Sequence, residues 1–311
     1  MIDLVTNVTV NKIESEFLNK HGVQLFIQRE DLIHPLISGN KWRKLKYNIL
    51  KFKTGSYKSI LTFGGTSSNH IAATAAAGKL YNIPTIGIIR GEEKTDLSHT
   101  LFFAQEQGMK LCYVNRDKYK LKNTDHFLNE LKQQFPHAMI IPEGGANKEG
   151  IIGCSEITNI HQDFDYIFSA CGTGSTIAGI ISTLKNHQNA IGIPALKNAD
   201  FLYNDIKNHL KLLNNSNNNW HLNLDYHFGG YAKYKDELLD FIQDFYVQFQ
   251  IKLDPIYTGK MMFAIFDLIS KNNIKNCKVL AIHTGGLQGI PDFEKRYKKI
   301  LFRDGNSNLN Q

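Results

Sequence analysis

Short apolar runs alternate with longer amphipathic segments along most of the chain. The apolar runs are rich in β-branched and aromatic residues and end in glycine or polar turns, which is typical of buried strands. We predict strands at residues 59–65, 85–91, 110–114, 165–172 and 278–286. Helices are predicted at 70–82, 97–108, 175–186 and 261–270. Strands that alternate with helices in this way indicate an α/β fold with parallel sheets.

One further helix is predicted within "SGNKWRKLKYNIL", residues 38–50. Trp42, Leu45 and Ile49 recur at a spacing of three and four, and a Ser-Gly-Asn turn precedes them. Lys41 therefore lies at the helix entrance, where a cation is disfavoured. It is either a solvated lysine, as most are, or a reactive amine held in a pocket to form a Schiff base.

Length and composition place the chain among ordinary globular proteins. Its 311 residues, 42% of them apolar and 21% charged, suffice for one large or two moderate domains. No apolar run is long enough to span a bilayer, and the N-terminus lacks the order of a signal peptide, so we expect a cytoplasmic protein without a membrane partner. The four cysteines show no metal-ligand spacing, so we expect neither a metal site nor a disulfide framework.

A net charge of +7 raises the possibility of nucleic-acid binding. The basic residues are spread along the chain and interleaved with acidic ones, whereas a nucleic-acid interface needs a clustered basic face. We therefore expect no nucleic-acid partner. A mildly basic surface also attracts small anions.

Three predicted strands end in polar, glycine-rich turns, where α/β sheets bind ligands. The first turn, "GGTSSNH" (64–70), places Ser68 and Asn69 at a helix entrance. Either residue could be an ordinary N-cap, but the turn also offers Thr66 and Ser67, and a cap needs only one such side chain.

The second turn, "CGTGST" (171–176), has the composition of an anion cradle. Glycines at 172 and 174 let backbone amides turn inward, and Thr173, Ser175 and Thr176 bring hydroxyls to a helix N-terminus. The lysine of a Walker A loop is missing, and the GxGxxG pattern of dinucleotide sites is absent. A phosphate held without a lysine suggests the monophosphate of a cofactor.

Two later stretches add candidate polar groups. "HTGG" (283–286) follows the last strand and offers Thr284 to a ring nitrogen, while His283 alone is more often a core residue. "DPIYTGK" (254–260) places Tyr257 before a helix, where it either packs or faces a ligand. An amine, a phosphate cradle, an asparagine and hydroxyls at strand ends suit pyridoxal 5′-phosphate.

Five motifs in order, "GNKWRKL", "GGTSSNH", "GTGST", "DPIYTGK" and "HTGG", resemble the 1-aminocyclopropane-1-carboxylate deaminase / D-cysteine desulfhydrase family. This family belongs to the fold-type II, tryptophan-synthase-β-like pyridoxal phosphate enzymes, and the resemblance runs from about Gln28 to Gly289. It implies a two-domain α/β fold with parallel-rich sheets flanked by helices, the cofactor in the interdomain cleft, and a homodimer. We expect a larger domain of residues 1–43 and 154–311 and a smaller one of residues 44–153.

The resemblance also implies roles for single residues. Lys41 would bond the cofactor covalently and move protons, and Asn69 would bond its 3′-oxygen. The phosphate would be held by Gly172, Thr173, Gly174, Ser175 and Thr176, and Thr284 would face the pyridine nitrogen. Ser68 and Tyr257 would be catalytic. The substrate side would comprise Ser67, Ser68, Asn69, Tyr231, Tyr257 and Thr258, with Ser67 standing where many relatives carry glutamine.

Two positions bear on the activity. By the resemblance, deaminases carry glutamate after the tyrosine and leucine in the last motif, whereas this chain has Thr258 and Thr284. A carboxylate would strengthen the electron sink more than a neutral hydroxyl does. This favours α,β-elimination from a β-thiol amino acid, D-cysteine to pyruvate, ammonia and hydrogen sulfide. The alternatives are the deaminase and a non-catalytic homologue that binds the cofactor or an amino acid. Retention of Lys41, Ser68, Asn69 and Tyr257 argues against the latter.

Overall fold

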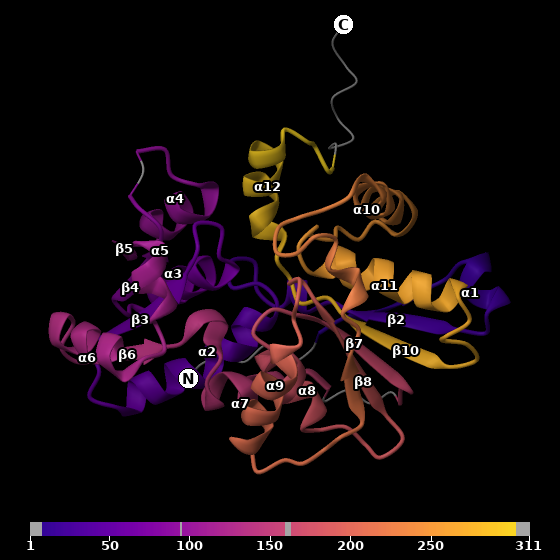
Figure 1. Ribbon diagram of the computed structural model, residues 1–311, viewed down its shortest axis with the longest axis horizontal. Helices are drawn as coiled ribbons and strands as arrows, with labels where there is room; N and C mark the ends of the chain where they lie inside the picture. The colour runs from indigo at the N-terminus through magenta and orange to yellow at the C-terminus, as the bar shows by residue number, and fades with distance from the viewer. Residues whose placement is uncertain (1–7, 94, 159–162, 303–311) are drawn as a thin grey trace, which may run out of the picture.

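The computed structural model describes residues 8–93, 95–158 and 163–302, and its strands form two sheets (Figure 1). The first sheet has the order β1-β2-β10-β7-β8-β9 and the second the order β5-β4-β3-β6. All strand pairs are parallel except β1 with β2. The strands are β1 (Val10–Ile13), β2 (Gln24–Gln28), β3 (Ser59–Gly64), β4 (Thr85–Arg90), β5 (Lys110–Val114), β6 (Ala138–Ile141), β7 (Tyr166–Cys171), β8 (Asn189–Pro194), β9 (Trp220–Leu222) and β10 (Lys278–Ile282).

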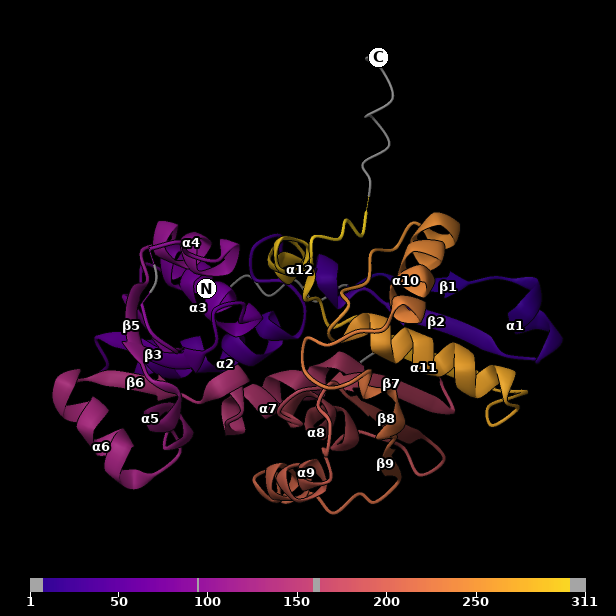
Figure 2. The same ribbon diagram turned by 45° about the horizontal axis from the view of Figure 1, so that its top comes forward.

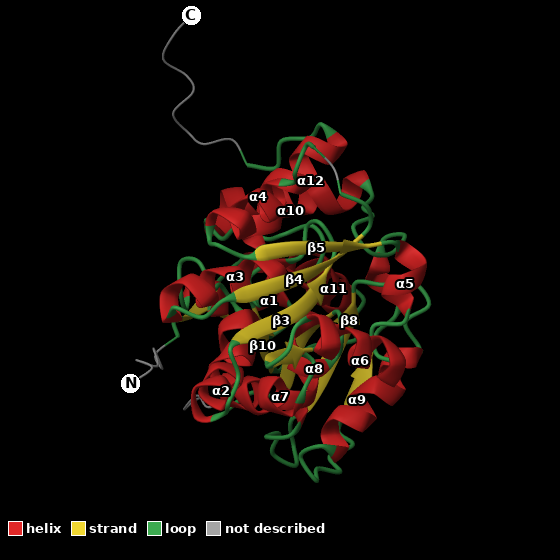
Figure 3. Cartoon of the chain, turned by 90° about the vertical axis from the view of Figure 1, so that its left-hand side faces the viewer, coloured by secondary structure: helices red, strands yellow, loops and turns green. Residues whose placement is uncertain are grey.

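Helices cover both sheets. They are α1 (Glu16–Lys20), α2 (Asn40–Thr54), α3 (Asn69–Tyr81), α4 (His99–Glu106), α5 (Arg116–Lys120), α6 (Asp125–Gln134), α7 (Lys148–Ser155), α8 (Ser175–Ile181), α9 (Phe201–Lys211), α10 (Asp236–Phe249), α11 (Thr258–Ser270) and α12 (Ile290–Tyr297). In Figure 3, α2 and α3 lie on one side of β3 and β4, and α5 and α6 lie on the other. The α/β class expected from the strand and helix alternation is confirmed.

Each sheet has an apolar core on both faces. In the four-stranded sheet, Ile60 packs with Trp42 and Leu45 of α2, whereas Leu61 on the opposite face packs with Phe127 of α6. This alternation is what a strand between two helix layers requires. The six-stranded sheet has one core shared with α10 and α11 and another shared with α7, α8 and α9.

Predicted strands all occur, but some ends differ. The helix expected over 175–186 ends at Ile181. Ser182 and Thr183 follow, and their hydroxyls donate to the carbonyls of Gly179 and Ile180. Such bonds compete with helix continuation. The strand expected over 278–286 ends at Ile282, before two glycines with positive φ.

The helices α2 and α7 lie between the two sheets and pack against each other (Figure 1). The boundaries expected at residues 43/44 and 153/154 both fall inside these helices. We therefore propose that α2 and α7 form the junction of the two domains.

A second connection between the two parts lies at α12, which is placed between α4 and α10 in Figures 1 and 2. The carboxylate of Asp292 accepts hydrogen bonds from the backbone of His99, at 2.7 Å, and from the hydroxyl of Thr100, at 2.6 Å. Among the residues described, no helix has the length and apolar character needed to cross a membrane.

Candidate active site

A cavity of about 1420 Å³ opens where the carboxyl ends of β3, β7 and β10 meet the start of α2. Most of the predicted site residues line it: Lys41, Ser67, Ser68, Asn69, Gly172, Thr173, Gly174, Thr176, Tyr231, Tyr257 and Thr284. The structure therefore brings together side chains that lie more than two hundred residues apart in the sequence. Ser175 and Thr258 are fully buried and do not line the cavity.

A glycine allows α2 to begin against the end of β10. Gly39 has φ +67°, and a Cβ placed on it would lie 1.9 Å from the carbonyl oxygen of Thr284. The next backbone amide, that of Asn40, donates to the same oxygen at 3.1 Å. Because only glycine fits this close approach, the turn fixes Lys41 beside Thr284.

The amine of Lys41 is held by its neighbour in the sequence. Its Nζ donates to Oδ1 of Asn40 at 2.8 Å, and Nδ2 of Asn40 donates to the hydroxyl of Thr176 at 2.8 Å. Burial, aided by the positive charge of Lys44, lowers the pKa of Lys41 to about 7. A large share of these amines is therefore uncharged at neutral pH, which is the form that reacts with an aldehyde or takes up a proton.

Lys44 is a site residue that the motifs did not reveal. Its Nζ donates to the carbonyl of Gly144 at 2.9 Å, and burial lowers its pKa. Gly144 in turn packs against Thr173, since a Cβ on it would lie 3.0 Å from the Thr173 methyl group. The sequence indicated a phosphate held without a lysine; Lys44, which bonds the segment that packs on the loop, is a further candidate for holding it. Its spacing of three from Lys41, on one helix face, was the available signal.

The loop after β7 turns through Gly174, which has φ +76° and precedes α8. The hydroxyls of Thr173 and Ser175 lie 3.0 Å apart, so Ser175 supports the loop from the protein side. His209 of α9 donates from Nε2 to the carbonyl of Thr173 at 3.1 Å, and burial lowers the pKa of this histidine.

The loop after β3 contains a helix cap and a buried amide oxygen without a hydrogen-bond partner among the described residues. Ser68 is the N-cap of α3, and its hydroxyl accepts from the backbone amide of Ile71 at 3.4 Å. This is the ordinary capping role that the sequence analysis gave as an alternative to a functional one. Asn69 Oδ1 is buried and has no hydrogen-bond partner among the described residues. A buried polar atom without a partner is costly, so a ligand that donates to it would be favoured.

Two tyrosines, Tyr231 and Tyr257, also line the cavity. The rings of Tyr231 and Tyr257 meet edge to face with their centroids 6.1 Å apart. Burial and the neighbouring Tyr231 raise the pKa of Tyr257 well above its usual range. Tyr257 is therefore a protonated phenol at neutral pH and can donate a proton or a hydrogen bond.

Thr258 organises the start of α11 instead of facing the cavity. Its hydroxyl donates to Asp254 Oδ1 at 2.7 Å, and its backbone amide donates to the same oxygen at 2.9 Å. The amides of Ile256 and Tyr257 donate to Oδ2 of this buried carboxylate. Thr258 was expected on the substrate side, but here its side chain bonds Asp254 and does not line the cavity.

His283 is a buried core residue, as the sequence analysis expected for a lone histidine. Its Nε2 donates to a backbone carbonyl at 2.7 Å, and its Nδ1 accepts from the amide of Gly285 at 3.3 Å. It is 1% exposed and does not line the cavity.

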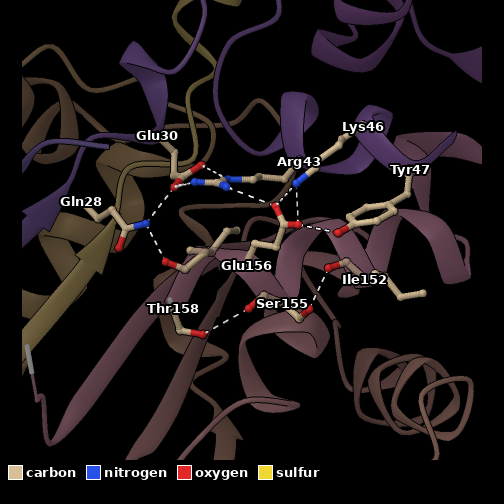
Figure 4. Close-up of polar contacts among 10 residues, drawn as sticks. Gln28, Glu30, Arg43, Lys46, Tyr47, Ile152, Ser155, Glu156 and Thr158 are labelled. Atoms are coloured by element: carbon tan, nitrogen blue, oxygen red, sulfur yellow. Dashed lines mark hydrogen bonds and ion pairs between the residues drawn. The ribbon is translucent and has the colours of Figure 1, made fainter. Parts of the chain in front are cut away.

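A buried ion-pair network holds α2, the helix that carries Lys41 (Figure 4). Nε and Nη2 of Arg43 donate to the two carboxylate oxygens of Glu30 at 2.9 and 3.0 Å. Lys46 and Tyr47 bond the carboxylate of Glu156 at the junction with α7. Arg43 and Lys46 of α2 are therefore buried partners and not part of a solvated face.

Comparison with known proteins assigns the chain to a family. The model of the family described as "Pyridoxal-phosphate dependent enzyme" matches residues 8–285. A Pyrococcus horikoshii protein named "Putative 1-aminocyclopropane-1-carboxylate deaminase" is 31% identical, with 90% of each chain covered. The Arabidopsis thaliana "Bifunctional D-cysteine desulfhydrase/1-aminocyclopropane-1-carboxylate deaminase, mitochondrial" is 30% identical over 88% of this chain and 74% of that protein. A crystal structure of an "ACC deaminase homologue" superposes with a TM-score of 0.82 at 27% identity, covering 95% of this chain and 94% of the other.

The chain belongs to the pyridoxal-phosphate dependent enzymes and, within them, to the 1-aminocyclopropane-1-carboxylate deaminase / D-cysteine desulfhydrase family. It is an α/β enzyme of fold type II that uses pyridoxal phosphate. The site fits this cofactor on its own evidence, because it offers an amine of lowered pKa, a glycine-rich loop with an amine nearby, and an unpartnered buried amide oxygen.

Proposed function

We propose that this enzyme catalyses the α,β-elimination of D-cysteine, which with one water gives pyruvate, ammonia and hydrogen sulfide. The observation that carries the proposal is Thr284, a neutral hydroxyl residue that lines the cavity where the deaminases are expected to carry leucine. Thr258 is likewise neutral, where they are expected to carry glutamate. Neither residue adds a carboxylate that would strengthen the electron sink, but Thr258 is bonded to Asp254 and does not line the cavity, so the preference for the better leaving group is argued from Thr284 alone.

Two loops and one helix would hold the cofactor. Gly172, Thr173 and Gly174 supply backbone amides to the phosphate, and Lys44 supplies the positive charge. The side-chain amide of Asn69, which lines the cavity, would bond the 3′-oxygen of the cofactor ring. When bound, pyridoxal phosphate supplies an electron sink for negative charge at the substrate's α-carbon.

The proton transfers are divided between Lys41 and Tyr257. Lys41 Nζ, uncharged in a large fraction near pH 7, takes the proton from the α-carbon. The hydroxyl of Ser68 accepts from its own helix, and its proton stays available to orient the substrate carboxylate. Tyr257 Oη remains protonated and donates to the departing sulfur.

A second candidate is deamination of 1-aminocyclopropane-1-carboxylate. Its support is the name of the Pyrococcus horikoshii relative and of the crystal structure described as an ACC deaminase homologue. A non-catalytic homologue is less well supported, since a reactive amine and a protonated phenol both face the cavity. A homodimer and a cytoplasmic location stay predictions.

The test is a comparison of kcat/KM for D-cysteine, L-cysteine, D-serine and 1-aminocyclopropane-1-carboxylate, with the keto acid identified in each case. We expect D-cysteine to be preferred and to yield pyruvate. Preferred turnover of 1-aminocyclopropane-1-carboxylate to 2-oxobutyrate would establish the second candidate instead.

A further inference from the structure

Lys260, in the first turn of α11, is a charged side chain in an unusual place. It is 1% exposed, and its Nζ donates to three backbone carbonyls: His227 at 2.8 Å, Gly230 at 2.8 Å and Ala195 at 3.4 Å. No carboxylate of the described residues is in ion-pair contact with this amine. A buried lysine is normally paired with an acid, but here backbone carbonyls replace its water and the buried carboxylate of Asp254 attracts the amine without contacting it.

The backbone on one side of Lys260 is bent into a conformation that side chains disfavour. Phe228 and Ala232 have φ +51° and +53°, and Gly229 and Gly230 have φ +93° and +115°. Left-handed residues that are not glycine cost free energy and persist where the surroundings hold them. The bend directs the carbonyls of His227 and Gly230 toward one point, and the amine occupies that point.

A group of inward-facing backbone carbonyls is the ligand set that proteins use for K⁺ and similar monovalent cations. The ammonium of lysine is a compact charge with three donors, which matches three carbonyls. We propose that the Lys260 ammonium is a tethered monovalent cation: it fills a carbonyl site that would otherwise take K⁺ or NH₄⁺.

This cation has a direct link to the active site. Tyr231 follows Gly230 in the sequence, and Tyr257 lies one turn before Lys260. The cation therefore joins the two segments whose tyrosine rings meet on the cavity wall. Lys260 is a positioning residue, since it does not line the cavity itself.

The test compares the wild type with Lys260→Ala in KCl, NH₄Cl and tetramethylammonium chloride at equal ionic strength. Tetramethylammonium is too large and has no N–H donor, so it keeps ionic strength constant without filling the site. The wild type should have the same kcat/KM and the same unfolding midpoint in all three salts. In tetramethylammonium chloride the variant should lose about tenfold or more in kcat/KM, because the carbonyls lose their charged partner.

Rescue is the decisive readout, because a lysine with a merely structural role would not be replaced by a free ion. KCl or NH₄Cl should restore the kcat/KM of Lys260→Ala along a saturable curve and raise its unfolding midpoint by several degrees, about 5 °C. Lys271→Ala, at the exposed end of the same helix, is the matched control and should show no such salt specificity.

Three outcomes would overturn the proposal. The first is a Lys260→Ala enzyme with wild-type kinetics in tetramethylammonium chloride, and the second is a folded, impaired variant that behaves alike in all three salts. The third is a wild type that itself requires K⁺. If the variant folds poorly, its refolding yield is compared between KCl and tetramethylammonium chloride. A higher yield in KCl supports the proposal, and equal yields refute it. The unfolding and refolding measurements need no substrate, so they stand even if D-cysteine is inert.

Discussion

The side-chain nitrogen of Asn40 donates a hydrogen bond to the hydroxyl of Thr176 across 2.8 Å, between residues 136 positions apart in the chain. The oxygen of the same amide accepts from Lys41 Nζ at 2.8 Å. One buried asparagine thus ties the reactive amine on α2 to the phosphate loop at α8.

Replacement of Asn40 by alanine should therefore impair catalysis more than folding. The variant loses two hydrogen bonds worth about 1 kcal/mol each, so we expect kcat/KM to fall by about tenfold or more. Asn48→Ala is the control, because Asn48 is a buried asparagine of the same helix that bonds Lys44 O and Asn147. It should lower the free energy of unfolding while kcat/KM changes less. Equal kinetic losses in both variants would show that Asn40 has no special role.

The lowered pKa of Lys41 predicts a pH profile for cofactor uptake. Because burial moves this pKa from 10.5 down to about 7, the uncharged amine increases as pH rises through 7 and is nearly complete a unit above it. The rate at which apoprotein takes up pyridoxal phosphate, trapped with borohydride on Lys41, should follow that curve and then level off. Lys44→Met should move the midpoint upward, since the charge of Lys44 contributes to the shift. A rate that climbs steadily to pH about 10 would indicate an ordinary lysine.

The Glu30–Arg43 pair predicts a large effect on stability. Glu30→Gln leaves the buried guanidinium of Arg43 without its carboxylate, and loss of one partner of such a pair costs about 3 kcal/mol or more. Urea unfolding measures this directly. Lys51→Met, also on α2, breaks an exposed ion pair with Glu149 of α7. It should lower the free energy of unfolding by less than about 1 kcal/mol. Similar values for the two variants would contradict the structural account of α2.

Substitutions of Thr284 and Thr258 should have different effects, the first on substrate preference and the second on stability. Thr284→Leu changes a side chain that lines the cavity, so it should lower the ratio of D-cysteine to 1-aminocyclopropane-1-carboxylate turnover. Thr258→Val removes the hydroxyl bonded to Asp254 and should reduce stability by about 1–3 kcal/mol, with that ratio unchanged. Rates for both substrates and unfolding curves for both variants provide the measurement. A changed ratio of the two substrate rates in Thr258→Val would show that Thr258 does act on substrate selection.

Local signals in the sequence located five of the ten described strands, β3, β4, β5, β7 and β10, and five of the twelve described α-helices, α2, α3, α4, α8 and α11. The buried strands β3, β4 and β7 are continuous apolar runs, and Gly39 marks the start of α2 because no other residue fits beside Thr284. The motifs also located the loops at the strand ends, since such loops gather at one edge of a parallel sheet.

Long-range polar contacts could not be predicted in the same way. Arg43, Lys44 and Lys46 have the pattern of a solvated helix face, yet all three are buried because α2 is packed on more than one side. Their partners Glu30, Gly144 and Glu156 come from distant segments. Lys260 was part of a recognised motif, but its carbonyl partners depend on a bend at residues 228–232 that only the folded chain reveals.

The most direct test of the proposed function is the stoichiometry of products from D-cysteine. Sulfide, pyruvate and ammonia should appear at equal rates with the wild type, and none should appear above background with Lys41→Ala, even when that variant retains pyridoxal phosphate through the phosphate loop. The contrary result is a wild type that releases no sulfide from D-cysteine while it converts 1-aminocyclopropane-1-carboxylate to 2-oxobutyrate and ammonia.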